Sequence, residues 1–290
     1  MNSQPQPLVS VVMPSLNQAG FLAASLDSVL SQCYPQVELI VADGGSADGS
    51  LALLEEKRKQ DPRLRILAGP DAGPADAVNK GLRAARGTVI GWLNSDDLYA
   101  PGAVERAVAA LLEHEDWLLA YGQGQHIDER GTITGTYPTL APPVPIDRFQ
   151  QGCFICQPTV FFRRTLPLLL GGLDTTLQTA FDLDYWLRAF KAFPGRIGFV
   201  ATVQAYSRLH PHCITRRMRR TVALEGMRVL AEHLGAAPRH CFTAHLAEIR
   251  ADGGYSPDYA ADLLAESRPY LLPQDHAYLS HRIAAETDRG

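Results

Sequence analysis

Two adjacent aspartates, Asp96 and Asp97, directly follow an apolar segment and are the carboxylates of the chain most suited to chemistry. Neighbouring carboxylates repel each other, so the ionised pair needs a cation or several hydrogen-bond donors. Hard oxygen ligands suit Mg²⁺ and Mn²⁺, which commonly bind through one or two carboxylates together with substrate phosphates. A helix N-cap and turn before Pro101 would explain the same residues, and the pair alone favours neither interpretation.

A third aspartate, Asp43, ends another apolar segment and is followed by Gly44 and Gly45. Its carboxylate could accept hydrogen bonds from a base or a ribose, while the glycines would let a ligand approach the backbone closely. The alternative is a turn in which Asp43 bonds its own backbone. The chain contains neither G-x-x-x-x-G-K-[ST] nor G-x-G-x-x-G, so a bound metal would have to carry much of the recognition of a diphosphate. That absence favours the metal interpretation of Asp96 and Asp97.

Buried strands and amphipathic helices alternate in the part of the chain that carries these residues. Such alternation predicts an α/β fold with a mostly parallel central sheet covered by helices on both faces. In open α/β sheets, ligands bind beyond the carboxyl ends of the strands, which is where Asp43, Asp96 and Asp97 fall. Strands are expected over residues 9–13, 37–42, 63–67 and 88–93, and helices over 22–33, 51–59, 75–85 and 101–112.

The rest of the chain has a less regular pattern. The proline-rich segment 137–146 predicts a loop. Residues 159–162 and 199–203 predict further strands, and residues 182–193 predict a helix. From residue 215 onward the pattern is helical, with breaks at Pro and Gly.

Composition limits the functional class. The 290 residues are 46% hydrophobic and 20% charged, which predicts a soluble globular protein. The net charge of -4 argues against a nucleic-acid partner. No apolar stretch approaches the roughly 18 residues of a membrane span, and the N-terminus has no signal-peptide pattern, so we expect a cytoplasmic protein.

The sequence predicts no catalytic role for two further groups of residues, the clustered arginines and the cysteines. The arginines within residues 216–220 are expected on a solvated helix face. Their alternative role is contact with a phosphorylated or lipid-linked acceptor, or peripheral contact with the inner face of the membrane. The five cysteines are odd in number and scattered, so they predict neither a disulfide framework nor a zinc site.

Eight short segments together resemble the motifs of glycosyltransferase family 2, a family of inverting enzymes with the GT-A fold, which is a Rossmann-like α/β fold. Their order and rough spacing are those of the family, and they cover about residues 8–212. Each segment is weak by itself, but the set is specific. The matching segments are residues 9–17, 41–50, 76–81, 91–97, 157–162, 171–174, 181–188 and 208–211.

The resemblance implies an architecture and an activity. The expected GT-A domain spans residues 1–212, with a nucleotide-binding half at 8–115 and an acceptor-binding half at 116–212, and a helical extension follows at 213–290. The implied reaction is the metal-dependent, inverting transfer of a sugar from a nucleotide-diphosphate-sugar, most commonly a UDP-sugar, to an acceptor hydroxyl. The expected acceptor is a glycan or a lipid-linked molecule in the synthesis of polysaccharide, O-antigen or another cell-surface glycan.

The resemblance also implies roles for individual residues. Asp97 matches the ligand of Mn²⁺ or Mg²⁺, and His210 matches a histidine near the metal or diphosphate, although a structural histidine explains His210 equally well. Asp43 would face the base, Asp76 the base or ribose, and Asp96 the donor sugar and ribose. The implied donor-binding residues are Pro14, Ser15, Asn17, Asp43, Asp76, Lys80 and Asp96.

Asp182 matches the carboxylate that acts as catalytic base in the family. Phe181 stands where a glutamate often precedes that base, which makes Asp184 a rival candidate. Residues two apart on a helix do not share a face, so we expect only Asp182 to point into the cleft. An exposed helix charge or an N-cap would otherwise explain Asp184. The acceptor side is expected to include Gln157, Asp184 and Trp186.

Two other functions use part of the same pattern. A sugar nucleotidyltransferase also combines an α/β nucleotide domain with acidic metal ligands. It usually has a Gly-rich basic loop after the first strand, and residues 14–20 contain no basic residue. The other function is that of an inactive glycan-binding homologue, and the joint presence of Asp43, Asp97 and Asp182 argues against it.

Overall fold

The computed structural model describes residues 6–287 and divides into two compact units. The first, the sheet unit, contains the residues up to 145, 154–178 and 188–210. The second, the helical unit, contains residues 146–153, 179–187 and those from 211 onward. The predicted boundary after residue 212 lies next to the last crossing between the units, but the helical unit also takes up two earlier segments. The predicted division of the first domain into two halves stays a prediction.

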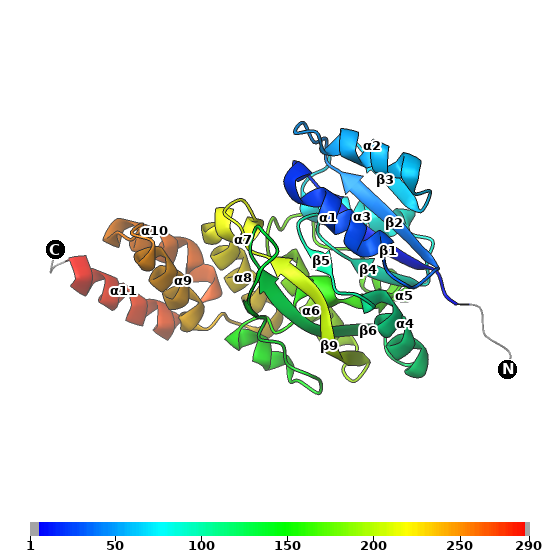
Figure 1. The fold of residues 1–290 in the computed structure, drawn as a ribbon. Helices are drawn as coiled ribbons and strands as arrows, with labels where there is room; N and C mark the ends of the chain where they lie inside the picture. The colour runs from blue at the N-terminus through cyan, green and yellow to red at the C-terminus, as the bar shows by residue number, and fades with distance from the viewer. Residues whose placement is uncertain (1–5, 288–290) are drawn as a thin grey trace. The chain divides into compact units, whose positions relative to one another are not determined.

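Nine strands of the described chain form one mixed sheet in the sheet unit (Figure 1). The strand order is β3-β2-β1-β4-β8-β6-β9-β5, with β7 paired to β6. The first four of these strands run parallel, as the alternating pattern predicts. Beyond β4 the pairing is mixed, because β8 is antiparallel to β4 and β6 whereas β6 and β9 are parallel. The strands are β1 (Val9–Ser15), β2 (Val37–Asp43), β3 (Leu64–Ala68), β4 (Val89–Trp92), β5 (Leu98–Tyr99), β6 (Leu119–Ile127), β7 (Ile133–Thr136), β8 (Phe161–Arg163) and β9 (Ile197–Arg208).

Helices cover both faces of the parallel half of the sheet. On one face, apolar residues of α1 and α4 form a single core with Val9, Val11 and Met13 of β1. On the other face, α3 comes so close that a Cβ atom at Gly81 would lie 2.3 Å from Cγ1 of Val12. These helices are α1 (Ala19–Leu30), α2 (Ser50–Gln60), α3 (Pro74–Ala84), α4 (Ala103–Glu113) and α5 (Thr165–Leu170).

Strand β6 is the main element that the sequence pattern did not predict. Two glycines interrupt its apolar pattern, and both are required by close packing. A Cβ atom at Gly122 would lie 2.4 Å from Cγ of Gln204, and one at Gly124 would lie 2.4 Å from Sγ of Cys156. Its partner β9 continues to Arg208, beyond the predicted strand, because it pairs with β6 as far as that residue.

The helical unit is built on the helices that follow residue 213, in agreement with the helical pattern of that region. Met227, Phe242 and Leu263 are fully buried among them. The side chain of Ser256 caps α10 by accepting the N–H of Tyr259 at 3.0 Å. None of the helices within residues 6–287 is long and apolar enough to cross a bilayer. The elements are η1 (Ile146–Gln151), α7 (Ile214–Arg217), α8 (Arg219–Leu234), α9 (Arg239–Ala251), α10 (Pro257–Ser267), η3 (Arg268–Tyr270) and α11 (Pro273–Thr287).

Helix α6 (Phe181–Ala192) has its first residues, up to 187, in the helical unit. The 3-10 turn η2 (Gln157–Thr159) belongs to the sheet unit. It occupies the start of the strand that was predicted over residues 159–162, and the strand β8 begins only at Phe161.

Candidate functional site

The carboxyl ends of β1 and β2 form a pair of hydrogen-bonded loops. Asp43, only 1% exposed, accepts the N–H groups of Gly45 and Ser46 at 3.0 and 2.8 Å and the hydroxyl of Ser46 at 2.7 Å. Asn17, with a φ of 54°, donates its N–H to Ser46 Oγ and accepts the N–H of Ala47. The turn in which Asp43 bonds its own backbone is therefore present, and base recognition by Asp43 stays a prediction.

Asp48 supports the same loops and was not among the predicted residues. It accepts the N–H of Ala19, the first residue of α1, at 2.9 Å, and the N–H and hydroxyl of Ser50 at 3.0 and 2.6 Å. Burial acts to raise the pKa of Asp48, but the hydrogen bonds from Ser50 and Ala19 outweigh it and lower the pKa. A negative charge is thereby held at the N-terminus of α1, where the helix dipole favours it. Its place in the family-like segment 41–50 was the available signal.

Pro14 and Ser15 end β1 and are buried. The Ser15 hydroxyl has no hydrogen-bond partner among the described residues. Buried polar groups normally have a partner, so this hydroxyl at the carboxyl end of a strand suits a ligand that would supply one.

Asp76 and Lys80 lie close together on α3. Oδ2 of Asp76 accepts the N–H of Ala72 at 3.1 Å and lies 3.3 Å from Nζ of Lys80, which also donates to the carbonyl of Pro70 at 2.6 Å. The Ala72 bond, with the charge of Lys80, lowers the pKa of Asp76 despite some burial. Lys80 also lines an open cavity of about 560 Å³ beside the end of β3. Contact of either residue with a nucleotide stays a prediction.

Asp97 is held rigidly behind the end of β4. The residue is 4% exposed, and its Oδ1 accepts the backbone N–H of Arg208 at 2.8 Å while its Oδ2 accepts an N–H of the Asn94 amide at 3.2 Å. Burial and the negative charge of Asp96 raise the pKa of Asp97 well above its ordinary value, although the hydrogen bonds from Arg208 and Asn94 act in the opposite direction. A cation next to the two carboxylates would offset this repulsion.

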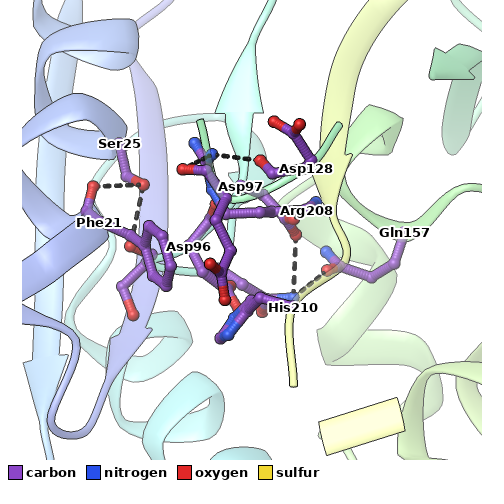
Figure 2. A network of polar contacts seen from close by, with 11 residues as sticks. Phe21, Ser25, Asp96, Asp97, Asp128, Gln157, Arg208 and His210 are labelled. Atoms are coloured by element: carbon purple, nitrogen blue, oxygen red, sulfur yellow. Dashed lines mark hydrogen bonds and ion pairs between the residues drawn. The ribbon is translucent and has the colours of Figure 1, made fainter. Parts of the chain in front are cut away.

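Asp96 points away from those bonds, toward His210 (Figure 2). Its Oδ2 lies 3.1 Å from Nε2 of His210, whose side chain is 2% exposed. Phe21 packs against His210 and Arg208, with its ring centroid 4.6 Å from that of His210 and 4.9 Å from Cζ of Arg208. The guanidinium of Arg208 donates to the Asp96 carbonyl at 2.7 Å and to that of Asp128 at 2.8 Å. Arg208 thus ties the end of β9 to the loop of the two aspartates, a role that the sequence analysis did not assign.

Gln157, predicted on the acceptor side, also belongs to this network (Figure 2). Its Nε2 donates to the Trp92 carbonyl at 2.8 Å, and its Oε1 accepts Nδ2 of Asn94 at 2.9 Å. Asn94 in turn donates to Asp97. Gln157 therefore links η2 to the end of β4, and any contact with an acceptor stays a prediction.

Few of the described acidic and histidine side chains are grouped so that they could hold a metal. Among residues 6–287, no group of three or more His, Cys, Asp or Glu side chains is arranged to hold an ion. Asp96 and His210 nevertheless provide a carboxylate and an imidazole side by side. Mg²⁺ and Mn²⁺ are often held by one or two protein carboxylates while substrate phosphates and water complete the shell. The residues present thus fit a divalent cation that arrives with a diphosphate.

Asp182, the predicted base, lies in the first turn of α6 in the helical unit. Its Oδ1 accepts the N–H of Leu183 at 2.8 Å. Burial raises the pKa of Asp182 to about 6, even though backbone hydrogen bonds from Leu183 and from its own N–H act to lower it. A carboxylate with this pKa is ionised at neutral pH and is more basic than an ordinary aspartate, which suits a general base.

Asp184 and Trp186, both predicted on the acceptor side, are buried residues of α6. Asp184 is 7% exposed, and its Oδ1 lies 2.8 Å from Nε2 of His233 on α8. Its interpretation as an exposed helix charge is therefore wrong. Trp186 is completely buried, and contact of either residue with an acceptor stays a prediction.

The arginine cluster divides into two pairs. Arg219 forms an ion pair with Asp252, and Arg220 forms one with Glu266 at 2.9 Å. Arg216 and Arg217 are exposed. Arg219 and Arg220 are thus engaged in ion pairs, whereas Arg216 and Arg217 are the most exposed of the four, and contact of any of them with an acceptor stays a prediction.

The predicted site residues are grouped by unit. The donor-side residues, the two adjacent aspartates, Gln157 and His210 all belong to the sheet unit. Asp182, Asp184 and Trp186 belong to the helical unit.

Known proteins resemble the chain in sequence and in fold. A glycosyltransferase of Rickettsia felis is 28% identical over 221 residues, which are 70% of this chain and 34% of that protein. The chain therefore spans about a third of the length of that relative. The structure of S. aureus TarS 1–349 in complex with UDP matches 96% of this chain and 87% of its own with a TM-score of 0.62 at 20% identity. The mannosyltransferase PcManGT from Pyrobaculum calidifontis, in complex with GDP-Man and Mn²⁺, matches 97% of this chain and 80% of its own with a TM-score of 0.61 at 20% identity.

These structural matches confirm the GT-A fold predicted from the sequence. The family model described as "Glycosyl transferase family 2" matches residues 10–166, which include β1 to β4, the donor loops and both adjacent aspartates. Because this match covers more than half of the 290 residues, the chain belongs to glycosyltransferase family 2.

Proposed function

We propose that the chain transfers a sugar, with inversion, from a nucleotide-diphosphate-sugar to an acceptor hydroxyl in the synthesis of a glycan. The observation that carries this proposal is the Asp96–His210 pair at the carboxyl end of β4, backed by the buried Asp97. A UDP-sugar is the first candidate donor, because TarS binds UDP in a structure of the same fold. A GDP-sugar is the second, because PcManGT binds GDP-Man.

We assign the metal-binding role to Asp96 and His210. The sequence pointed to Asp97 as the ligand, but both oxygens of Asp97 already accept hydrogen bonds from Arg208 and Asn94. Asp97 therefore fits a residue that fixes the loop and adds negative charge behind it. A divalent cation bound at Asp96 would supply a positive charge that stabilises the departing diphosphate. The Mn²⁺ in the PcManGT complex supports the choice of ion.

Asp182 has the properties of a general base for the acceptor. Its carboxylate, with a pKa of about 6, would accept the hydroxyl proton as the oxygen attacks the sugar. A single base suffices for an inverting transfer, whereas a retaining glycosidase needs a second carboxylate as nucleophile. The acceptor hydroxyl would belong to a glycan or a lipid-linked molecule, and the exposed Arg216 and Arg217 suit a phosphorylated carrier.

The decisive experiment is a thermal-shift screen of UDP- and GDP-sugars with and without Mn²⁺. A ligand that binds only the folded state stabilises it in proportion to the logarithm of its excess over the dissociation constant, so the true donor should give the largest Mn²⁺-dependent shift. The control is Asp96→Ala, which should bind without any dependence on Mn²⁺. A screen in which no nucleotide sugar shifts the melting temperature contradicts the proposal. Release of pyrophosphate from a nucleoside triphosphate and a sugar phosphate would instead identify a nucleotidyltransferase.

A further inference from the structure

Helix α8 holds the backbone immediately ahead of α6 within the helical unit. One oxygen, Oε2 of Glu225, accepts the N–H of Thr179 at 2.8 Å, the hydroxyl of Thr179 at 2.7 Å and the N–H of Ala180 at 3.1 Å. These two residues directly precede Phe181, where α6 begins. A residue 45 positions further along the chain than Ala180 thus fixes the entry into the helix that carries Asp182.

The start of α6 needs such an acceptor. The carbonyl of Ala180 accepts the N–H of Asp184 at 3.0 Å, which makes Ala180 the N-cap, but its methyl group offers no oxygen. The first four N–H groups of a helix have no partner within it. Glu225 accepts the N–H of Ala180, and Asp182 itself accepts the N–H of Leu183. The two carboxylates therefore share the capping of one helix terminus.

A second contact from α8 lies on the other side of Asp182. His233 Nε2 is 2.8 Å from Oδ1 of Asp184, and the two side chains are only 14% and 10% exposed. With its proton on Nε2, the imidazole donates to the carboxylate. Glu225 and His233 are about two turns apart on α8. Helix α8 thus binds the chain just before and just after Asp182.

We propose that α8 is a positioning element of the transferase site and that Glu225 aligns the Asp182 carboxylate. This proposal rests on the proposed role of Asp182 as the base. Misplacement of a reacting group by about 1 Å lowers turnover by about a hundred-fold, so this anchor acts on turnover without touching donor or acceptor. Residues well beyond the family match at 10–166 thereby take part in the reaction.

The first test measures the anchor without any substrate. Hydrogen exchange of the full chain is followed by mass spectrometry in Glu225→Ala and in Glu232→Ala. Glu232 is the matched control, because it lies on the same helix, is 51% exposed and bonds Arg228 of that helix at 2.8 Å. The amides of residues 179–184 should exchange faster in Glu225→Ala alone. Equal protection in the two variants overturns the proposal.

The second test measures nucleotide release from the UDP- or GDP-sugar that gives the largest Mn²⁺-dependent thermal shift. We expect kcat to fall on the order of ten- to a hundred-fold in Glu225→Ala, with the donor KM unchanged. The kcat of Glu225→Gln should lie between those of Glu225→Ala and the wild type, because the glutamine carbonyl still accepts N–H bonds. The kcat of Glu232→Ala should match that of the wild type. A folded Glu225→Ala with normal kcat, or a loss confined to the donor KM, overturns the proposal.

The closing experiment combines Glu225→Ala with Asp182→Asn. If Glu225 acts through Asp182, the double variant should turn over no more slowly than Asp182→Asn alone, because residues that act as a unit are not additive. Additive losses overturn the positioning role. A folded Asp182→Asn with wild-type turnover would instead refute the base assignment of the proposed function. An inactive Asp182→Asn beside a fully active Glu225→Ala refutes only the inference about α8.

Discussion

Asp97, which is buried, and Asp182, which is half-buried, both have raised pKa values, and they differ in what surrounds them. Asp97 has a charged neighbour, Asp96, that adds to the effect of burial, and both of its oxygens accept hydrogen bonds from Arg208 and Asn94. For Asp182, burial is the only cause that raises the pKa, and its Oδ1 accepts an N–H of its own helix. A carboxylate held on both oxygens fits a fixed electrostatic support, whereas one with a pKa of about 6 fits a proton acceptor.

The comparison also shows how each unit fixes its carboxylate. In the sheet unit, the loop of Asp96 and Asp97 is tied by Arg208 and by Ser25, whose hydroxyl donates to the Ser95 carbonyl at 2.9 Å (Figure 2). In the helical unit, the turn around Asp182 is tied by side chains of α8. Both sites are thus positioned by side chains distant in sequence, and each can be weakened separately.

The largest effect is expected from removing the proposed proton acceptor, Asp182, alone. Asp182→Asn removes the basic oxygen but keeps the size of the side chain, so turnover should fall by about 10² to 10⁴. Donor binding, measured by calorimetry in the presence of Mn²⁺, should stay close to that of the wild type. Wild-type turnover in this variant would mean that Asp182 is not the base, and that its difference in surroundings from Asp97 does not reflect a catalytic role.

The next largest effects distinguish the roles of the two adjacent aspartates, Asp96 and Asp97. Asp96→Ala should abolish the Mn²⁺ dependence of donor affinity. Asp97→Ala leaves the buried N–H of Arg208 without its acceptor, so it should lower the free energy of unfolding by about 1–3 kcal/mol. Denaturant unfolding and calorimetry of both variants measure the two quantities. Loss of the Mn²⁺ dependence in Asp97→Ala but not in Asp96→Ala would return the ligand role to Asp97.

The pH dependence sharpens the distinction further. A base must be deprotonated, so turnover should fall as the pH drops through about 6, the pKa of Asp182. Burial raises this pKa from 3.8, which disfavours the charged form in the folded protein. Protonation of Asp182 therefore favours the folded protein. This stabilisation is fully present below about pH 4 and is lost as the pH rises through about 6. The residual activity of Asp182→Asn should lack this acid limb, and a limb that persists unchanged would assign it to another group.

The parallel half of the sheet could be predicted from sequence because its strands are continuous apolar runs between amphipathic helices. Residues Val9, Val11, Val12 and Met13 are all fully buried, so the local pattern already contains the packing. β6 could not be predicted in this way. Its glycines are required by contacts with Gln204 and Cys156, which lie far away in the chain.

The site shows the same limit at the level of single residues. The motif locates Asp96 and Asp97, and the resemblance implied the metal ligand at Asp97, but it could not reveal the hydrogen bond that Asp97 accepts from Arg208, 111 residues away. Likewise, nothing local to Asp184 reveals His233, 49 residues further on. Sequence therefore predicts which segments carry the chemistry, whereas long-range hydrogen bonds decide which of two neighbouring carboxylates is available for it.

The smallest expected effect tests the rival base. Asp184→Asn keeps an oxygen that can accept a hydrogen bond from His233, so the free energy of unfolding should fall by only about 0.5–1.5 kcal/mol and turnover by less than about ten-fold. Denaturant unfolding and nucleotide release measure the two effects, with Asp182→Asn as the paired control. The two substitutions remove the same charge two positions apart on one helix, so general loss of negative charge cannot explain a difference between them. A folded Asp184→Asn with the larger loss of turnover would transfer the role of base to Asp184, and Asp182 would then be only a cap of its own helix.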